Sequence, residues 1–266
     1  MKYIYRFSTP KSTNTIANNI SSKQPFVLYT YRQRAGKGMG TNSWFTGHGK
    51  NIAMSVCFEP KFLSPDRQFL LNIALSTALR NSLQSLLPKQ KILLKWPNDI
   101  YVSDNSDGNK KLVGILFENK ISGGDGEFSK SIMGIGINVN QKKFPDSLPN
   151  PVSMRLVSGK QFCKKKIVLQ ICSELENAFY ALANSLSENS CDTVWLEFKK
   201  KYLSNLLFYG VMRNYIYKEI PVRGSIFDVD DFGRLLLKKD NGDVICCDVK
   251  ELKIPYIAEP LPLNEA

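Results

Sequence analysis

A glycine-rich segment between residues 33 and 44 holds the first residues whose types and spacing could do chemistry. Its glycines alternate with a lysine and a methionine in the order Gly36, Lys37, Gly38, Met39 and Gly40. Alternate glycines allow a tight turn that presents backbone N–H groups to an anion, and the lysine adds positive charge. The spacing matches neither a Walker A loop nor the GxGxxG fingerprint. Taken alone, the segment is compatible with a phosphate-binding loop and equally with a mobile turn.

The run from Lys95 to Asp99 reads Lys-Trp-Pro-Asn-Asp and lies at the end of a predicted strand. Trp96 offers a flat apolar surface, and Asn98 and Asp99 carry polar groups able to hold a purine, a ribose or Mg²⁺. A tight turn between strands with a core tryptophan explains the run as well. From these residues alone we favour the turn.

Two further segments place glycine inside predicted strands. Lys110 and Lys111 open a strand that contains Gly114, and a later segment alternates Gly134 and Gly136 with isoleucine. Glycine within a strand marks a bulge or the close approach of a ligand or another backbone. A lysine here can neutralise a phosphate or a carboxylate, although solvated lysines and close packing also account for both patterns.

The composition excludes several classes of function. The chain has 266 residues, of which 43% are hydrophobic and 23% charged, as is typical of a folded globular protein. His48 is the one histidine, so a histidine-rich zinc site is excluded, and Ser-His-Asp or Cys-His catalysis would depend on that residue. The six cysteines show no CxxC spacing and are predicted to be reduced. With no apolar run of membrane-spanning length and no signal-peptide pattern, we predict a cytoplasmic protein.

Periodicity predicts strands and helices around these segments. The predicted strands cover residues 4–7, 25–33, 51–59, 91–102, 111–119 and 128–140. A short helix is predicted from its cap at Ser12 to Asn19, and a longer one from Ser64 and Pro65 until Pro88 ends it. Two more helices with apolar faces are predicted within residues 168–182 and 194–202.

From about residue 221 the pattern changes to short alternating segments. Turn signals at Asp230–Gly233 and Asp240–Gly242 join them, which predicts a small all-β barrel. We place a domain boundary near residue 215, which divides the chain into residues 1–215 and residues 216–266.

The order and spacing of these segments resemble a known family. The matching segments are Ser12-Thr13-Asn14, Gln33 through Trp44, Lys95 through Asp99, Lys111 through Leu116, and Gly134 through Asn138. With the small C-terminal barrel, they make the chain similar to the biotin-protein ligases. The resemblance implies an α+β fold with a mixed, mostly antiparallel sheet and flanking helices, like the class II tRNA synthetase core. It also implies a C-terminal SH3-like β-barrel.

The resemblance further implies a reaction. Members of the family activate biotin with ATP and Mg²⁺ as biotinyl-5'-AMP. They then transfer the biotinyl group to a lysine of the biotin carboxyl carrier protein of acetyl-CoA carboxylase or a related carboxylase, so they are amide-forming ligases. Because a carboxylate is a poor acyl donor, it must first be activated. Positioned cations and N–H donors, rather than a histidine base, should carry such catalysis.

Carried over by position, the resemblance assigns Lys111 as the catalytic cation between the biotin carboxylate and the α-phosphate. The biotin-binding residues would be Ser12, Thr13, Asn14, Gln33, Gly36, Lys37, Gly38, Met39, Lys111, Gly114, Gly134 and Gly136. The nucleotide-binding residues would be Lys37, Met39, Trp44, Asn98, Asp99, Lys111 and Asn138, with Asp99 also a candidate ligand of Mg²⁺. Many members carry arginine at the positions of Lys37 and Met39, so weaker retention of biotinyl-AMP is expected here.

The resemblance also bears on partners and alternatives. The Ser-Thr-Asn motif begins at residue 12, which leaves no room for the N-terminal helix-turn-helix of some members, so no binding to a DNA operator is expected. No membrane association is expected, and a homodimer is one option. The net charge of +12 suits an acidic carrier and a nucleic acid alike. The alternatives are a lipoate-protein ligase or octanoyl transferase, a nucleic-acid-binding protein, and an inactive family member.

Overall fold

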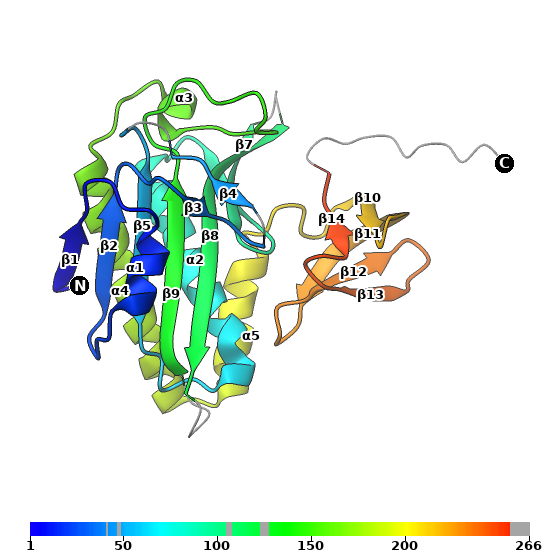
Figure 1. The fold of residues 1–266 in the computed structure, drawn as a ribbon. Helices are drawn as coiled ribbons and strands as arrows, with labels where there is room; N and C mark the ends of the chain where they lie inside the picture. The colour runs from blue at the N-terminus through cyan, green and yellow to red at the C-terminus, as the bar shows by residue number, and fades with distance from the viewer. Residues whose placement is uncertain (41, 47–48, 105–107, 123–127, 256–266) are drawn as a thin grey trace.

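The computed structural model describes residues 1–40, 42–46, 49–104, 108–122 and 128–255. Its centre is a seven-stranded sheet with the strand order β1-β2-β5-β9-β8-β7-β6 (Figure 1). The strands are Tyr3–Arg6 (β1), Phe26–Thr30 (β2), Ile52–Phe58 (β5), Lys91–Lys95 (β6), Asp99–Asp104 (β7), Gly108–Ile121 (β8) and Phe128–Ile137 (β9). Only β1 and β2 pair in parallel, and the other neighbours in this sheet are antiparallel. The predicted mixed, mostly antiparallel sheet is confirmed.

Helices flank this sheet on both faces, as predicted. The helices α2 (Gln68–Leu86), α4 (Lys164–Glu188) and α5 (Cys191–Leu203) cover one face, and the short α1 (Thr13–Asn19) lies against the other (Figure 1). Ser12 caps α1 by accepting a hydrogen bond from Thr15 N–H, as predicted. Among the described residues, no helix has the length and the hydropathy that a membrane span needs.

The main core fills the space between the sheet and the three large helices. Ile52 and Val56 on β5, Leu71 and Leu75 on α2, and Ile171 on α4 are fully buried in it. The helix α2 buries residues on several of its faces because the sheet, α4 and α5 all pack against it. Burying apolar surface stabilises a fold by roughly 25 cal/mol per Å². This core therefore fixes the sheet against the three helices.

The predicted single strand over residues 91–102 is wrong, because the structure contains a hairpin there. The strands β6 and β7 are antiparallel, and Lys95 pairs with Asp99 at the turn. Pro97 has no N–H to give to a sheet ladder, so a continuous strand through it is disfavoured. The turn predicted from the local residues is therefore present, whereas the longer strand is not.

Other differences concern short elements and ends. The predicted strand over 128–140 ends at Ile137, and the predicted cap at Ser64 precedes a 3-10 turn, Pro65–Arg67 (η1), without making a side-chain capping bond. The two-residue strands Gly36–Lys37 (β3) and Ser43–Trp44 (β4) and the short helix Met154–Ser158 (α3) were not predicted. Elements of one turn or one bridge carry too little periodicity to be detected.

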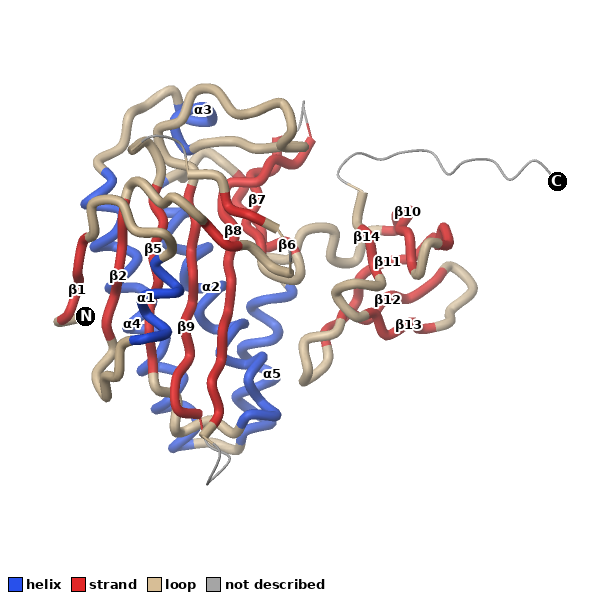
Figure 2. Tube along the Cα trace, in the orientation of Figure 1, coloured by secondary structure: helices blue, strands red, loops and turns tan. Residues whose placement is uncertain are grey.

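A second, five-stranded sheet follows, with the order β13-β12-β11-β10-β14 (Figure 2). Its strands are Met212–Tyr217 (β10), Ile220–Val229 (β11), Leu235–Lys239 (β12), Val244–Cys247 (β13) and Leu252–Lys253 (β14), and all pairings are antiparallel. The turns predicted at residues 230–233 and 240–242 join β11 to β12 and β12 to β13. The sheet begins earlier than residue 221, since β10 was not predicted.

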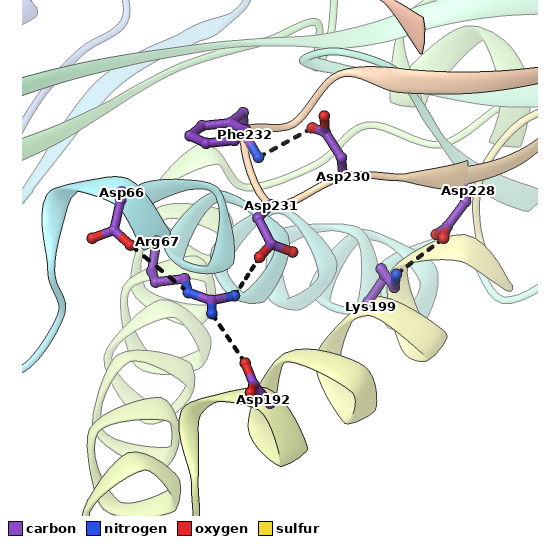
Figure 3. A network of polar contacts seen from close by, with 8 residues as sticks. All are labelled: Asp66, Arg67, Asp192, Lys199, Asp228, Asp230, Asp231 and Phe232. Atoms are coloured by element: carbon purple, nitrogen blue, oxygen red, sulfur yellow. Dashed lines mark hydrogen bonds and ion pairs between the residues drawn. The ribbon is translucent and has the colours of Figure 1, made fainter. Parts of the chain in front are cut away.

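A network of ion pairs joins this second sheet to the helices (Figure 3). The Arg67 guanidinium lies 2.5 Å from Asp231 of the β11–β12 turn and 3.0 Å from Asp192 at the start of α5. Lys199 on α5 lies 3.1 Å from Asp228 on β11. Lys199 therefore links α5 to the second sheet.

The same turn contacts the Lys-Trp-Pro-Asn-Asp run. The indole Nε1 of the buried Trp96 donates a hydrogen bond to the carbonyl of Gly233 at 2.8 Å. Gly233 has a φ of +85°, and a Cβ built on it would lie 2.4 Å from the ring of Phe69. Only glycine can therefore bring this backbone against both aromatic side chains.

The contact with Phe69 predicts that alanine variants of two turn glycines in the second sheet differ in stability. Gly233→Ala should lower the free energy of unfolding by about 2–4 kcal/mol, because it adds the clash with Phe69 to left-handed strain. Gly242→Ala is the matched control, since its φ is +91° and nothing lies within 4 Å of the added carbon. It should cost about 1–2 kcal/mol from strain alone. Urea unfolding of both variants measures the difference, and equal losses would contradict the importance of the Phe69 contact.

Candidate functional site

A cavity of about 1260 Å³ opens on the face of the seven-stranded sheet that carries α1. Its walls include the glycine-rich segment, the turn after β6, the start of β8 and the loop at residues 147–151. Ile216, Leu252 and Lys253 of the second sheet also line it. The volume exceeds the ~300–1,000 Å³ of most small-molecule sites. The cavity can therefore hold two ligands side by side.

The cavity gathers the residues that sequence reasoning selected. All but one of them line it, namely Ser12, Thr13, Asn14, Gln33, Lys37, Gly38, Met39, Trp44, Asn98, Asp99, Lys111, Gly114, Gly134, Gly136 and Asn138. Gly36 is the exception, and it lies behind the lining, where a Cβ would come 2.4 Å from the carbonyl oxygen of Trp44. His48 lies outside the described residues.

Trp44 packs into a slot between two glycines. Gly114 on β8 and Gly136 on β9 are directly opposite each other in the sheet. A Cβ would lie 2.7 Å from the Trp44 ring at Gly114 and 2.1 Å from it at Gly136, so neither position tolerates a side chain while Trp44 stays in place. The indole Nε1 is buried and has no hydrogen-bond partner among the described residues. The slot thus presents an apolar floor with one unused donor.

At the other end of the cavity, polar side chains surround the start of α1. The Ser12 hydroxyl accepts the N–H of Thr15, so it is used as a helix cap. Gln33 Oε1 accepts the backbone N–H of Thr13 at 2.9 Å and lies 3.3 Å from its hydroxyl. These bonds turn the amide oxygen of Gln33 toward α1 and leave its Nε2 as a donor.

Asp99 lies between two lysines. Lys111 Nζ is 2.7 Å from Asp99 Oδ1 and 5.8 Å from the centre of the Trp44 ring. Lys95 pairs with Asp99 across the β6–β7 hairpin. Desolvation lowers the pKa of the Lys95 ammonium, the Asp99 charge raises it, and the Lys111 charge lowers it. The side chains therefore place two cations around one carboxylate, which leaves net positive charge for an anionic ligand.

The same arrangement limits how a magnesium ion can be held. Asp99 is the one acidic side chain in the described lining, and Lys111 already bonds it. The described residues contain no group of three potential metal ligands. Mg²⁺ commonly binds through one carboxylate together with substrate phosphates. A single carboxylate such as Asp99 is compatible with a shared site of this kind, and its role as a ligand of Mg²⁺ stays a prediction.

The two predicted asparagines also hold the framework. Asn98 Nδ2 donates to the carbonyl of Ile115 at 2.5 Å, which ties the turn after β6 to β8. Asn138 is buried, and its Oδ1 lies 3.4 Å from Nδ2 of the fully buried Asn51. Asn51 also accepts the N–H of Val139 at 3.0 Å. Both asparagines therefore shape the wall of the cavity, and their roles toward a nucleotide stay predictions.

Comparison with known proteins assigns the chain to a family. The model of the biotin/lipoate A/B protein ligase family matches residues 6–138, which is half of the chain and includes every predicted site residue that lines the cavity. The chain belongs to the biotin/lipoate A/B protein ligase family. This assignment confirms the resemblance seen in the sequence.

Individual relatives in this ligase family agree with the match. The chain is 30% identical over 167 residues to the bifunctional ligase/repressor BirA of Bacillus spizizenii, which covers 62% of this chain and 48% of that protein. It is 30% identical over 118 residues to BirA of Escherichia coli, covering 44% of this chain and 34% of that protein. The chain thus spans about half the length of the Bacillus relative and about a third of the length of the Escherichia relative.

Solved structures agree in fold. A biotin protein ligase from Aquifex aeolicus in complex with biotin and ATP superposes with a TM-score of 0.74 at 22% identity, covering 95% of this chain and 98% of that chain. A biotin protein ligase from Leishmania major in complex with biotinyl-5-AMP gives a TM-score of 0.58 at 18% identity, covering 94% of this chain and 100% of that chain. At these identities the likeness shows the fold alone.

Several residues of the candidate site were not found from the sequence. Ser55 on β5 is fully buried and bonds Thr13 and Asn14, and Glu118 on β8 bonds Asn14. The contribution of the second sheet was missed as well. A serine within the apolar run of residues 52–58 was a usable signal, because buried polar groups need partners. Glu118 gave no signal, since a half-buried glutamate on a strand is ordinary.

The slot predicts how the glycine-rich segment is anchored. Gly136→Ala should displace Trp44, because the added carbon would lie 2.1 Å from the indole. With its anchor lost, the segment should be cut by trypsin after Arg34 and Lys37 several-fold faster than in the native protein. Gly134→Ala is the matched control, since its Cβ would meet Asn14 rather than Trp44. Mass spectrometry of a digestion time course gives the rates, and identical rates for the two variants would refute the anchoring role.

Proposed function

We propose that the protein is a biotin-protein ligase. The carboxylate of biotin attacks the α-phosphate of ATP, which releases pyrophosphate and forms biotinyl-5'-AMP. The amine of a carrier lysine then attacks the acyl carbon, AMP leaves, and an amide bond forms. The observation that supports this most directly is Lys111 held by Asp99 at 2.7 Å inside the large cavity, between its apolar floor and its positively charged wall.

In this proposal Lys111 is the main electrostatic catalyst. Negative charge builds on the phosphate and carboxylate oxygens in both steps, and a preorganised ammonium lowers that cost without moving in the reaction. The ion pair with Asp99 restrains the Lys111 ammonium, which lies 5.8 Å from the centre of the Trp44 ring. Mg²⁺ bound with ATP would neutralise the charge of the departing pyrophosphate. No general-base histidine is required, because the attacking carboxylate is already ionised.

The two ends of the cavity suit the two substrates. Thr13 and Gln33 supply polar groups for the ureido ring of biotin, and the slot around Trp44 supplies the apolar surface for its aliphatic part. Lys37, Met39, Asn98, Asp99 and Asn138 then face the nucleotide. This division follows the roles that the family resemblance implies for the same residues.

We also propose that the second sheet is an SH3-like β-barrel and forms a domain of its own. The antiparallel order of its five strands and the return of β14 to pair with β10 support this. In this proposal the domain starts with β10, which begins at Met212, close to the predicted boundary near residue 215. The domain contributes one wall of the cavity through Ile216 and Lys253.

The proposed macromolecular partner is a biotin carboxyl carrier protein. A chain with a net charge of +12 would attract an acidic carrier over a distance of about a Debye length. A homodimer, the absence of operator binding and a cytoplasmic location stay predictions.

The proposal is tested by pyrophosphate exchange into ATP, with biotin, with lipoate and with neither. Exchange should require biotin, and Lys111→Ala should lower its kcat by about 10²–10³-fold, because the cation that faces the developing charge is lost. Lys120→Ala is the matched control, since Lys120 lies on the same strand, is exposed, and bonds the carbonyl of Asn18. It should change the rate less than twofold.

Each other outcome has a defined meaning. Exchange that needs lipoate instead would assign the protein to the lipoate branch of the family. If the native protein shows no exchange with either acid, the proposal is contradicted. Full activity in Lys111→Ala would contradict the role of this lysine.

Met39 stands where many family members carry arginine, which predicts weak retention of biotinyl-AMP. Met39 lines the cavity and is 38% exposed. Met39→Arg should slow the release of biotinyl-AMP several-fold, because a guanidinium can bond the phosphate with two N–H groups. Met212→Arg on β10 is the control, since this methionine is exposed and does not line the cavity. Release is measured with radiolabelled adenylate, and equal rates for Met39→Arg and the native protein would show that residue 39 does not hold the intermediate.

A further inference from the structure

The loop after β2 and the turn before α1 carry exposed cations at the border of the cavity. Two backbone hydrogen bonds, of 2.8 and 3.0 Å, hold the two segments side by side. Lys11, Arg32 and Arg34 are exposed on them. Ser12 and Gln33, which directly adjoin these cations in the chain, line the cavity. The three charges therefore lie next to its lining and face outward.

Two more cations lie on the ring of Tyr31 in the same loop. Arg6 Cζ is 5.0 Å and Lys164 Nζ is 4.4 Å from the centre of this ring. Burial lowers the pKa of the Lys164 ammonium, the charge of Arg6 lowers it as well, and Cys163 raises it. The two cations thus repel each other across one aromatic ring. We call the whole set the basic rim, which consists of Arg6, Lys11, Arg32, Arg34 and Lys164.

The basic rim lacks carboxylates to neutralise it. Residues 1–58 of the sequence contain no aspartate and no glutamate. Within the part of the chain that the structure describes, no residue of the rim forms an ion pair, whereas Lys199 on α5 and Arg234 in the second sheet each have a carboxylate partner. Clustered like charges repel one another, so an anionic partner that covers the rim would be bound favourably.

We propose that the basic rim is the docking surface for an acidic protein domain that presents its acceptor lysine to the cavity. The inference rests on the proposed function and deepens it, because it names the face that the carrier contacts. The acceptor lysine must reach the acyl carbon inside the cavity, so its domain has to sit over the border where the rim lies. Complementary charge across such a contact speeds the encounter and fixes the orientation. The proposed reaction brings a protein domain, and no nucleic acid, to this border.

Charge reversal on the rim tests the proposal. Arg32→Glu combined with Arg34→Glu should lower kcat/KM for transfer to an apo biotin carboxyl carrier domain of net negative charge by about tenfold or more at low salt, because attraction becomes repulsion. The loss should shrink as sodium chloride is added, since salt screens exposed charges. Biotin-dependent pyrophosphate exchange involves no carrier, so it should keep the native rate. General loss of structure would instead lower exchange and transfer together.

A second double variant is the matched control. Lys91→Glu combined with Lys200→Glu makes the same change in net charge, at exposed positions that do not line the cavity. It should keep the native kcat/KM for the carrier domain, because these charges do not face the docked partner. If the variant at Arg32 and Arg34 fails to fold, Arg6→Glu combined with Lys11→Glu replaces it, with the same expected loss.

The outcomes separate this inference from the proposed function. Native transfer to the carrier domain by the folded rim variant overturns the inference and leaves the proposed function intact. Equal losses in exchange and transfer overturn it as well, and so does an equal loss of transfer in the control, which would make total charge the cause.

Two further results are decisive. If the rim variant loses binding to duplex DNA but transfers at the native rate, the rim serves a nucleic acid and the inference is wrong. If the native protein shows no exchange with biotin, the proposed function fails. Calorimetric binding of the apo carrier domain to the native protein and to the rim variant then decides the inference, which requires a weaker affinity in the variant.

Discussion

The cavity depends on three positions on the two central strands that carry no side chain. Gly114 and Gly136 face each other across β8 and β9 and admit the ring of Trp44, while Gly134 admits Asn14. Successive residues of a strand face opposite sides of a sheet, so Ile135 and Ile137 point into the core against the helices. One Gly-Ile-Gly-Ile segment therefore builds a rigid core on one side and a ligand-sized recess on the other. Adding a carbon at these glycines would fill the recess.

The sequence predicted the parts of the fold that follow local periodicity, and it selected most of the cavity lining. The helices α2 and α4 and the strands β5, β8 and β9 have long enough patterns to be detected, and the motif residues converge because these elements position them. What could not be predicted depends on contacts between distant residues. The bond from Trp96 to Gly233 and that from Asn14 to Glu118 join segments more than 100 residues apart, and no local pattern encodes them.

The electrostatics of the cavity rely on a carboxylate shared by lysines. Lys111 and Lys95 both lie near Asp99, and burial makes the charged form of Lys95 costly, as the lowered pKa shows. Two lysines and one carboxylate leave one positive charge unbalanced. A carboxylate or phosphate that enters beside Lys111 would balance it. Binding of an anion is thus favoured before any chemistry occurs. Because Asp99 already holds Lys111 in place, little side-chain entropy remains to be lost when the ligand arrives.

The second sheet is held against the cavity by contacts of unequal strength. The pair between Arg67 and Asp231 of the β11–β12 turn is partly exposed, with the Asp231 side chain at 43% exposure, and exposed pairs are worth ~0–1 kcal/mol. The bond from Trp96 to Gly233 is buried, so breaking it would leave an unsatisfied donor and acceptor at a cost of ~1–3 kcal/mol each. Trp96 lies three residues before Asp99 in the same turn. The bond from Trp96 to Gly233 therefore restrains both the second sheet and the turn that carries Asp99. The position of the cavity wall formed by the second sheet is thus coupled to the position of the carboxylate that holds Lys111.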